Sequence, residues 1–466
     1  MKRPSKKSCP GCRRLEALVE ALRAEVASLR EQLAAALKNS STSSKPPSSD
    51  IVKPKPLPAD DSAKRSIGGQ PGHPKHEREP FPVEQVTHFE THVLDSCPCC
   101  GGAVRRNGDK AKVVQQVDIS RPPQTIEQHT RPEFWCDHCN RGFVAALPMH
   151  IERGGLVGSQ LTALIAFMKG ACHASFSTTR TFLRDVVGVT ICRGQLSKII
   201  GKVSEALAKP HEELLARLPG EAALNVDETG HHDNGKLWWT WCFRAELYTL
   251  FHIDPHRSAD VLMDKLGQEF AGVLGCDYFS AYRRYQREFG VLLQFCLAHL
   301  IRDVKYLTTL PDPRDRAYGE RLREALRSLF AVIHRREKLS AEVFQGELEA
   351  ARAEVLRCGT QEVPETKHGR NLAKRFETHG ESYFRFVTTP GVEPTNNLAE
   401  QAIRFVVIDR LLTQGTRSEA GNRWCERIWT VIATCVQQDR SVFSYLEGAV
   451  GAWFEGAEAP SLLPGV

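Results

Sequence analysis

Apolar residues recur every seven positions close to the N-terminus of the 466-residue chain. They fall into two interleaved series, Leu15, Leu22 and Leu29 with Val19, Val26 and Leu33. Such a repeat over about three heptads predicts a coiled coil, which would join copies of the chain into a homo-oligomer. Because so few heptads are short for a stable zipper, one amphipathic helix packed on its own domain is the alternative.

Short apolar runs bounded by turn residues fill the middle of the chain and predict strands. The expected order is strand, strand, strand, helix, strand, over residues 222–226, 237–246, 247–253, 258–266 and 272–276. A helix over residues 281–289 and a strand over 291–296 follow. This order matches the ribonuclease-H-like plan, in which the first strand lies beside the fourth. We therefore expect a ribonuclease-H-like α/β core.

Helical spacing dominates the segments on either side of the strands. Residues 157–207 are helical throughout except for a break at 188–190. The helix after the break opens with Arg193, Gln195 and Lys198, polar side chains that suit the base-reading helix of a helix-turn-helix. A plain packing hairpin fits that pattern equally well. Residues 315–356 are rich in Arg, Glu, Leu and Ala and predict an α-helical insertion, which either holds DNA or only pads the fold.

The net charge of the chain is only +6, but the charges are unevenly distributed. Basic residues crowd the N-terminus, at Lys2, Arg3, Lys6, Lys7, Arg13 and Arg14, whereas acidic residues gather in the second half. A basic arm suits the phosphate backbone of a nucleic acid, although a solvated tail is the commoner explanation of a charge run. Residues 39–61 are rich in Ser, Pro and Lys and have too little apolar surface to fold, so we expect a tether.

Two features point to a cytosolic protein with no membrane contact. No run of about 18 apolar residues is present, and the N-terminus lacks the apolar segment of a signal peptide. In that compartment the 15 cysteines are expected to stay reduced and free to bind metal.

Cysteines form two C-x-x-C pairs, Cys97 with Cys100 and Cys136 with Cys139. Four thiolates of this kind predict a closed tetrahedral Zn²⁺ site with a structural role. A third pair, Cys9 and Cys12, has no clear partner and fits either a ligand pair shared across a dimer or a simple turn.

Three carboxylates in the second half of the chain carry the candidate chemistry. Asp227 and Asp277 each end an apolar run followed by turn residues, which indicates buried strands that deliver an acid to the edge of a sheet. Glu400 lies in a helical segment. Each acid alone fits a solvated cap or turn, but together they offer the oxygen ligands that Mg²⁺ or Mn²⁺ prefers. Two such ions about 4 Å apart can activate a nucleophilic oxygen and stabilise the leaving oxygen of a phosphodiester.

Three sequence blocks surround these acids. They are Val226-Asp227-Glu228-Thr229, Cys276-Asp277-Tyr278-Phe279-Ser280-Ala281-Tyr282 and Pro394-Thr395-Asn396-Asn397-Leu398-Ala399-Glu400-Gln401-Ala402-Ile403-Arg404. With the coiled coil, the linker that runs into Gly68-Gly69-Gln70-Pro71-Gly72-His73 and the paired cysteines, they resemble the insertion sequence 66 family of DDE transposases over nearly the whole chain. The sequence departs from the family at Gln401, where many members carry arginine.

The resemblance implies an enzyme that binds the terminal inverted repeats of an insertion sequence and performs metal-dependent strand cleavage and strand transfer. Asp227 would bridge two Mg²⁺ ions, and Asp277 and Glu400 would each hold one. Glu393 is the rival third acid. We prefer Glu400 because the motif match places it there and because a helix holds its position better than the turn at Pro394.

Further residues of these blocks have expected supporting roles. Asn396 and Asn397 would cap the helix that carries Glu400. Arg404, one turn beyond Glu400, would contact DNA phosphate.

A C-x-x-H pair, Cys296 and His299, follows the last predicted strand, as in several DDE transposase families. Two ligands are a weak metal signal, so we expect the pair to support the site, with Arg302 near phosphate. His231 and His232 follow Asp227, and we interpret them as solvated loop histidines rather than as groups that orient water.

The predicted organisation is multi-domain α+β. In order it comprises a basic arm and coiled coil (1–38), a flexible linker (39–80), a zinc-binding module (81–150), a helical, helix-turn-helix-like DNA-binding domain (151–215), the catalytic domain (216–410) with its insertion at about 305–385, and a helical tail (411–466). Since the acids lie after residue 220, we expect recognition and chemistry to be separable near that point.

The expected partners are the terminal repeats, target DNA, further copies of the chain and accessory proteins of the same element, and the expected location is the nucleoid. A DNA-binding regulator, or an inactive copy that binds element ends without cutting, is the alternative, as is a nuclease that hydrolyses without joining. The presence of all three acids argues against a regulator or an inactive copy.

Overall fold

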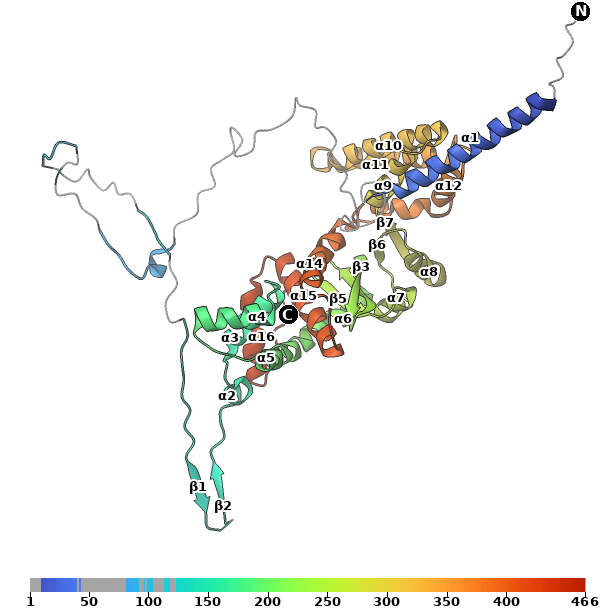
Figure 1. The fold of residues 1–466 in the computed structure, drawn as a ribbon. Helices are drawn as coiled ribbons and strands as arrows, with labels where there is room; N and C mark the ends of the chain where they lie inside the picture. The colour runs from blue at the N-terminus through green and yellow to red at the C-terminus, as the bar shows by residue number, and fades with distance from the viewer. Residues whose placement is uncertain are drawn as a thin grey trace, which may run out of the picture. The chain divides into compact units, whose positions relative to one another are not determined.

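The computed structural model describes residues 10–39, 42, 81–91, 96, 99–103, 113–117, 123–138 and 140–465 (Figure 1). The chain divides into two compact units. The larger comprises Met1–Pro54, Thr130–Arg184 and Thr190–Val466, and the smaller comprises Lys55–His129 and Asp185–Val189. In the smaller unit the Gln115 side chain accepts a hydrogen bond from the Phe81 amide at 2.7 Å and donates one to the Phe81 carbonyl at 3.0 Å.

The N-terminal helix α1 spans Pro10–Ala36, so the helix predicted from the heptads is present. Its apolar seam is exposed to solvent, at Leu15, Val19, Leu22, Val26, Leu29 and Leu33. Pairing of α1 with the same helix of a second copy, as the heptads predict, therefore stays a prediction.

A five-stranded mixed sheet forms the centre of the larger unit, in the order β5-β4-β3-β6-β7 (Figure 1). The strands are β3 (Ala223–Asp233), β4 (Lys236–Arg244), β5 (Thr249–Asp254), β6 (Val273–Cys276) and β7 (Leu292–Phe295). β3, β4 and β5 pair antiparallel, whereas β6 and β7 continue the sheet parallel to β3. The first strand of the sheet therefore lies beside the fourth, as the order of the apolar runs predicts.

The first strand is longer than the sequence interpretation allowed. β3 continues to Asp233, so Asp227 lies within the strand and the turn expected at Thr229 and Gly230 is wrong. The chain turns instead at Asn234 and Gly235, whose φ angles of 50° and 76° both lie in the left-handed region. Asn-Gly is the favoured pair for such a two-residue hairpin, because its twist matches that of the strands.

Helices of the predicted insertion form a layered group with α9 (Leu297–Leu307) (Figure 1). They are α10 (Pro313–Ile333), α11 (Ala341–Thr360), α12 (Lys367–His379) and, after a short 3-10 turn at Gly380–Tyr383, α13 (Arg385–Thr388). Asp312 caps α10 by accepting a hydrogen bond from the Arg314 amide, and Pro313 occupies the first turn, where no amide donor is needed. The Tyr318 hydroxyl donates to the Gly359 carbonyl at 2.6 Å and joins α10 to the end of α11.

Two shorter helices accompany the sheet, α7 (Ala259–Leu266) and α8 (Ser280–Phe289). A second helical group consists of α2 (Met149–Gly154), α3 (Ser159–Gly170), α4 (Phe176–Phe182), α5 (Arg193–Ala206), α6 (Ala208–Arg217), α14 (Asn397–Thr413), α15 (Glu419–Gln437) and α16 (Val442–Phe454). α3 packs on α5 and α16, and α5 packs on α15. At Gly170 a Cβ atom would lie 2.5 Å from the Ile428 Cγ1 atom, so this crossing of α3 and α15 requires glycine.

α15 covers the outer edge of the sheet. On the edge strand β5 the amides of Thr249, Phe251 and Ile253 donate hydrogen bonds to side chains of α15. The acceptors are Thr434 at 3.2 Å, Thr430 at 3.0 Å and Glu426 at 2.7 Å. The donor amides belong to alternate residues of β5, and the acceptor side chains are four residues apart on one face of α15. The spacing of the donors therefore matches the spacing of the acceptors.

Candidate active site

Asp227 lies on β3, and Asp277 directly follows β6, the neighbouring parallel strand. β3 and β6 pair in a register that sets Asn225 opposite Gly275. The two aspartates follow this pair at equal distance along the chain, so the parallel register brings both to the same level of the sheet. The Asp277 carboxylate accepts a hydrogen bond from the Phe279 amide at 2.8 Å, which fixes the loop that leaves β6.

The electrostatics of Asp227 connect all three predicted acids. Burial raises the pKa of Asp227 well above its usual value, and the negative charges of Glu228, Asp277 and Glu400 raise it further. Carboxylates from three distant blocks are therefore near enough to repel one another, and all three are half-buried. A divalent cation would relieve this repulsion and favour the ionised form, and the oxygen donors are those that Mg²⁺ and Mn²⁺ bind. The residues present thus fit the predicted metal.

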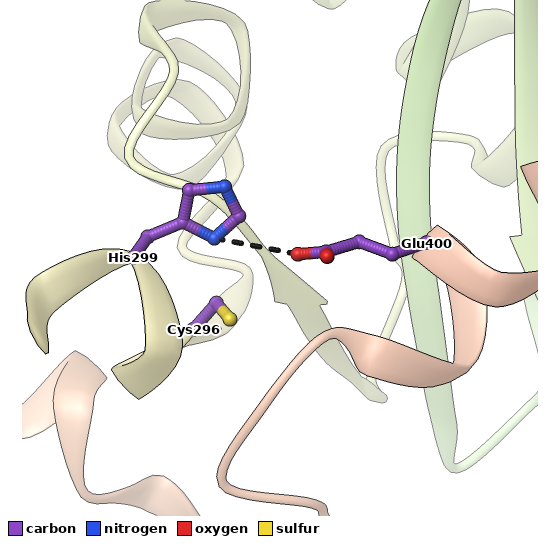
Figure 2. A group of neighbouring side chains, drawn as sticks. All are labelled: Cys296, His299 and Glu400. Atoms are coloured by element: carbon purple, nitrogen blue, oxygen red, sulfur yellow. Dashed lines mark ion pairs between the residues drawn. The ribbon is translucent and has the colours of Figure 1, made fainter. Parts of the chain in front are cut away.

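Glu400 lies on α14 and faces α9 (Figure 2). The His299 Nδ1 atom is 3.6 Å from Glu400 Oε1, and the Arg302 Nη2 atom is 3.7 Å from Glu400 Oε2. Arg302 Nη1 also lies 3.4 Å from His299 Nε2. Because a guanidinium only donates, this contact favours the imidazole tautomer whose proton lies on Nδ1, facing Glu400.

The surroundings of His299 shift its pKa toward the uncharged form. Burial lowers the pKa of His299, while the negative charge of Glu400 opposes that effect. His299 Nδ1 and Glu400 Oε1 are both buried and have no hydrogen-bond partner within the part of the chain that the structure describes.

Cys296 completes a compact group with His299 and Glu400 (Figure 2). Their ligand atoms lie within 4.8 Å of one another, and no other set of three metal-ligating side chains among the described residues is this close. Cys296 Sγ accepts a hydrogen bond from the Asn396 amide at 3.2 Å. Burial raises the pKa of the Cys296 thiol, which disfavours the thiolate needed for metal binding. The supporting role expected for the C-x-x-H pair stays a prediction.

Asn396 does not cap α14 as predicted, because its side chain makes no capping hydrogen bond. Its amide group donates to the Val226 carbonyl at 2.8 Å, and its side-chain oxygen accepts from Asn225 Nδ2 at 3.0 Å. The preference for asparagine at N-caps is overridden here by tertiary contacts with β3. Asn396 therefore links the start of α14 to the residues just before Asp227.

Glu228 is a site residue that the sequence interpretation missed. It is buried on β3, next to Asp227, and its carboxylate accepts from Arg257 at 2.7 Å and from the Tyr282 hydroxyl at 2.5 Å. The Arg257 guanidinium lies 4.1 Å from the centre of the Phe279 ring. Phe279 and Tyr282 belong to the block of Asp277, so Glu228 ties the first block to the second. The sequence did offer a signal for a separate role of Glu228, because side chains alternate along a strand and Glu228 therefore lies on the opposite face from Asp227.

The remaining predicted residues lie as follows. Arg193 and Lys198 are exposed and Gln195 is half-buried at the start of α5, and the Arg193 guanidinium donates to Ser177 at 2.6 Å. Arg302 is half-buried beside Glu400, whereas Arg404 and the rival acid Glu393 are exposed.

The interpretation of His231 as a loop residue is wrong. His231 lies in β3, is 1% exposed and hydrogen-bonds Thr416 at 3.0 Å. Burial lowers its pKa to about 4. His232 is also part of the strand but is exposed, as a solvated histidine would be.

The predicted zinc ligands are only partly described. Cys97 and Cys139 lie outside the described residues, and for Cys136 only the backbone is described, at the end of strand β1 (Glu133–Cys136). β1 pairs antiparallel with β2 (Arg141–Val144), and Cys100 is exposed. Cys9 and the start of the basic arm also lie outside the described residues.

None of the helices that the structure describes combines the length and the apolar character that a membrane span requires.

Comparison with known proteins gives two family matches. The model described as "Transposase IS66 family" matches residues 154–423, which contain all three acids. A second model, described as "Family of unknown function (DUF6444)", matches residues 1–79. Two proteins of Sinorhizobium fredii (strain NBRC 101917 / NGR234) are similar over most of the chain. "Uncharacterized protein y4qI" is 24% identical over 75% of this chain and 70% of its own, and "Uncharacterized protein y4hP" is 24% identical over 78% of this chain and 70% of its own.

Proposed function

The chain belongs to the Transposase IS66 family, and we propose that it is a DDE transposase that cuts and joins DNA at the ends of an insertion sequence. Membership of a transposase family implies a DNA-processing enzyme with DNA as its partner. The observation that carries the finer proposal is the parallel register of β3 and β6, which brings Asp227 and Asp277 to the same level of the sheet. The negative charge of Glu400, from the third block, helps to raise the pKa of Asp227. The strand order of the sheet supports a ribonuclease-H-like core.

Asp227, Asp277 and Glu400 are the residues that would hold Mg²⁺ or Mn²⁺. When bound, such ions activate the attacking oxygen and stabilise the leaving oxygen of a phosphodiester. The surrounding residues position these three acids. Asn396 holds α14 against β3, Glu228 ties β3 to the Asp277 block, and His299 faces the Glu400 carboxylate.

Recognition of the DNA is proposed to use residues outside the triad. Two helices offer exposed donors, with Arg193 and Lys198 in the first half of α5 and Arg404 in the middle of α14. Gln195 and Arg302 are half-buried and would contact DNA only at the edges of such surfaces. The exposed apolar seam of α1 supports pairing with a second copy of the chain. If the protein binds terminal repeats and target DNA as proposed, we expect it at the nucleoid.

Substitution of the acids tests the proposal. Asp227→Asn, Asp277→Asn and Glu400→Gln each remove a charged metal ligand while keeping its shape, so strand cleavage should fall on the order of a thousandfold or more. Binding of the same end DNA, measured by fluorescence anisotropy, should be nearly unchanged. The measurement is cleavage of a labelled terminal-repeat DNA with Mg²⁺.

Glu393→Gln is the matched control, because Glu393 is exposed and outside the acid cluster, and it should stay active. If the Glu400→Gln protein is active and the Glu393→Gln protein is inactive, Glu393 rather than Glu400 is the third ligand. Wild-type protein that binds element ends and never cuts them would favour the regulator instead.

We also propose a structural Zn²⁺ site formed by Cys97, Cys100, Cys136 and Cys139. Purified protein should then contain about one Zn²⁺ per chain from this module. The double variant Cys100→Ser with Cys136→Ser should lose that metal in elemental analysis. Unchanged zinc content in the double variant would remove the assignment.

A further inference from the structure

A hollow of about 730 Å³ lies between α8 of the core and the helical insertion. Three arginines line it, Arg283 and Arg287 from α8 and Arg385 from α13, and we call it the arginine pocket. α11, α12 and the turn after α12 supply the other walls. None of the three acids of the proposed cleavage site lines this pocket.

The arginine pocket has an excess of positive charge. Two carboxylates also line it, but both oxygens of Glu381 lie on the Arg352 guanidinium, at 2.6 and 2.7 Å. Glu377 in the lining and Glu288, whose Oε1 atom lies 4.0 Å from the Arg287 Nη2 atom, are left to oppose the three arginines. The Nε atoms of Arg283 and Arg385 are buried and lack a hydrogen-bond partner among the described residues. Such buried donors favour an anionic ligand, because an unsatisfied guanidinium N–H is costly.

The pocket is directly connected to the acid site. Tyr278 follows Asp277 in the chain, and its ring centre lies 4.3 Å from the Arg283 guanidinium and 3.9 Å from that of Arg375. The Tyr278 ring also contacts the ring of His379, which lines the pocket, with 5.6 Å between centres. A ligand in the pocket therefore lies beside the loop that carries Asp277.

We propose that the arginine pocket binds phosphate groups of the DNA strand that leads to the cleaved bond. Guanidinium groups form paired hydrogen bonds with phosphate, and several arginines can hold successive phosphates of one strand. This assignment rests on the proposed function, since it supposes a DNA strand at the acids. It adds the place where that strand is held.

Salt dependence of DNA binding by the full chain tests the pocket. The triple variant Arg283→Gln, Arg287→Gln, Arg385→Gln removes the charges, so the slope of log K against log salt should become shallower by about 0.9 for each lost phosphate contact. Terminal-repeat DNA is titrated by anisotropy without divalent metal, so that no cutting occurs. The corresponding triple lysine variant keeps the charges and should retain most of the slope.

A second triple variant, Arg314→Gln, Arg323→Gln, Arg327→Gln, removes equal charge from exposed positions of α10 outside the pocket. A pocket variant with the same slope as this control overturns the proposal. If the triple pocket variant does not fold, exposed Arg287→Gln alone decides, since its slope should fall by about 0.9 and an unchanged slope overturns the pocket.

Two other outcomes separate the hypotheses. Tighter, pocket-dependent binding of RNA of the same sequence would assign the pocket to RNA and overturn the DNA proposal. If the wild-type protein cuts DNA but the pocket variant has the same salt slope as the α10 control variant, only the pocket proposal is refuted. A wild-type protein that does not cut with Mg²⁺ refutes the proposed function, whatever the slopes are.

Discussion

A single buried amide holds the helix of Glu400 against the strand of Asp227. Asn396 is 1% exposed, and its side chain bonds both Val226 and Asn225. These bonds link the start of α14 to the residues immediately before Asp227. The positions of two of the three acids therefore depend on one side chain.

Asn396→Ala should lower the free energy of unfolding by about 2 kcal/mol, because it leaves the buried Val226 carbonyl and the half-buried Asn225 amide group without these partners. It should also raise the Mg²⁺ concentration needed for half-maximal cleavage, since Glu400 loses its fixed distance from Asp227. Urea unfolding and a Mg²⁺ titration of cleavage measure the two effects. Exposed Asn397→Ala is the control and should change stability by no more than about 0.5 kcal/mol. A lower stability with an unchanged Mg²⁺ requirement would make Asn396 a purely structural residue.

The sequence predicted some residue roles and could not predict others. Asp227 and Asp277 could be paired because both follow apolar runs whose order fixes the sheet. The roles of Asn396 and His231 could not be predicted, since each depends on a partner far along the chain, Val226 and Thr416. The local sequence preferences had assigned Asn396 to a helix cap and His231 to a loop. Tertiary contacts decided otherwise.

Among the elements, α15 has the clearest structural task. Its side chains at Glu426, Thr430 and Thr434 accept the outward amides of β5, which an edge strand otherwise leaves unpaired. The sequence predicted a helical tail here but not this role, because side chains that pair with a strand edge carry no distinctive pattern. The hairpin of β3 and β4 is the opposite case, since Asn234 and Gly235 were a usable turn signal.

Thr430→Val keeps the shape of the side chain and removes the acceptor for the Phe251 amide, which is then buried without a partner. The free energy of unfolding should fall by about 1 to 3 kcal/mol. Thr360→Val on α11 is the matched control, because Thr360 is exposed and bonds only its own helix, at Leu356. Equal destabilisation of the two variants in urea unfolding would contradict the edge-covering role of α15.

At the scale of the whole molecule, the helices before the sheet and those after it share one core. α16 packs on α3, α15 packs on α5, and the Arg427 guanidinium donates to the Ser204 carbonyl at 2.9 Å. Residues 159–184, 190–206 and 419–454 thus lie in the same unit. The expected separation of recognition and chemistry near residue 220 would cut through this core.

We therefore expect that neither residues 1–210 nor residues 215–466 fold independently. Each fragment alone should show reduced helix content and no cooperative unfolding by circular dichroism, because each exposes the apolar face that the other covers. Mixing the fragments should restore part of the helix signal. A fragment 215–466 that unfolds cooperatively at the midpoint of the intact chain would show that the two parts are independent after all.

The covered edge of β5 also has a genetic consequence. The family match ends at residue 423, and all three acids lie before that point, yet the acceptors at Glu426, Thr430 and Thr434 lie after it. A nonsense mutation just past residue 423 would leave the acids encoded and uncover a strand edge that can pair with the same edge of another chain. Such an allele should yield aggregated protein rather than a stable dominant-negative product. It should therefore be recessive in a cell that also carries an intact copy.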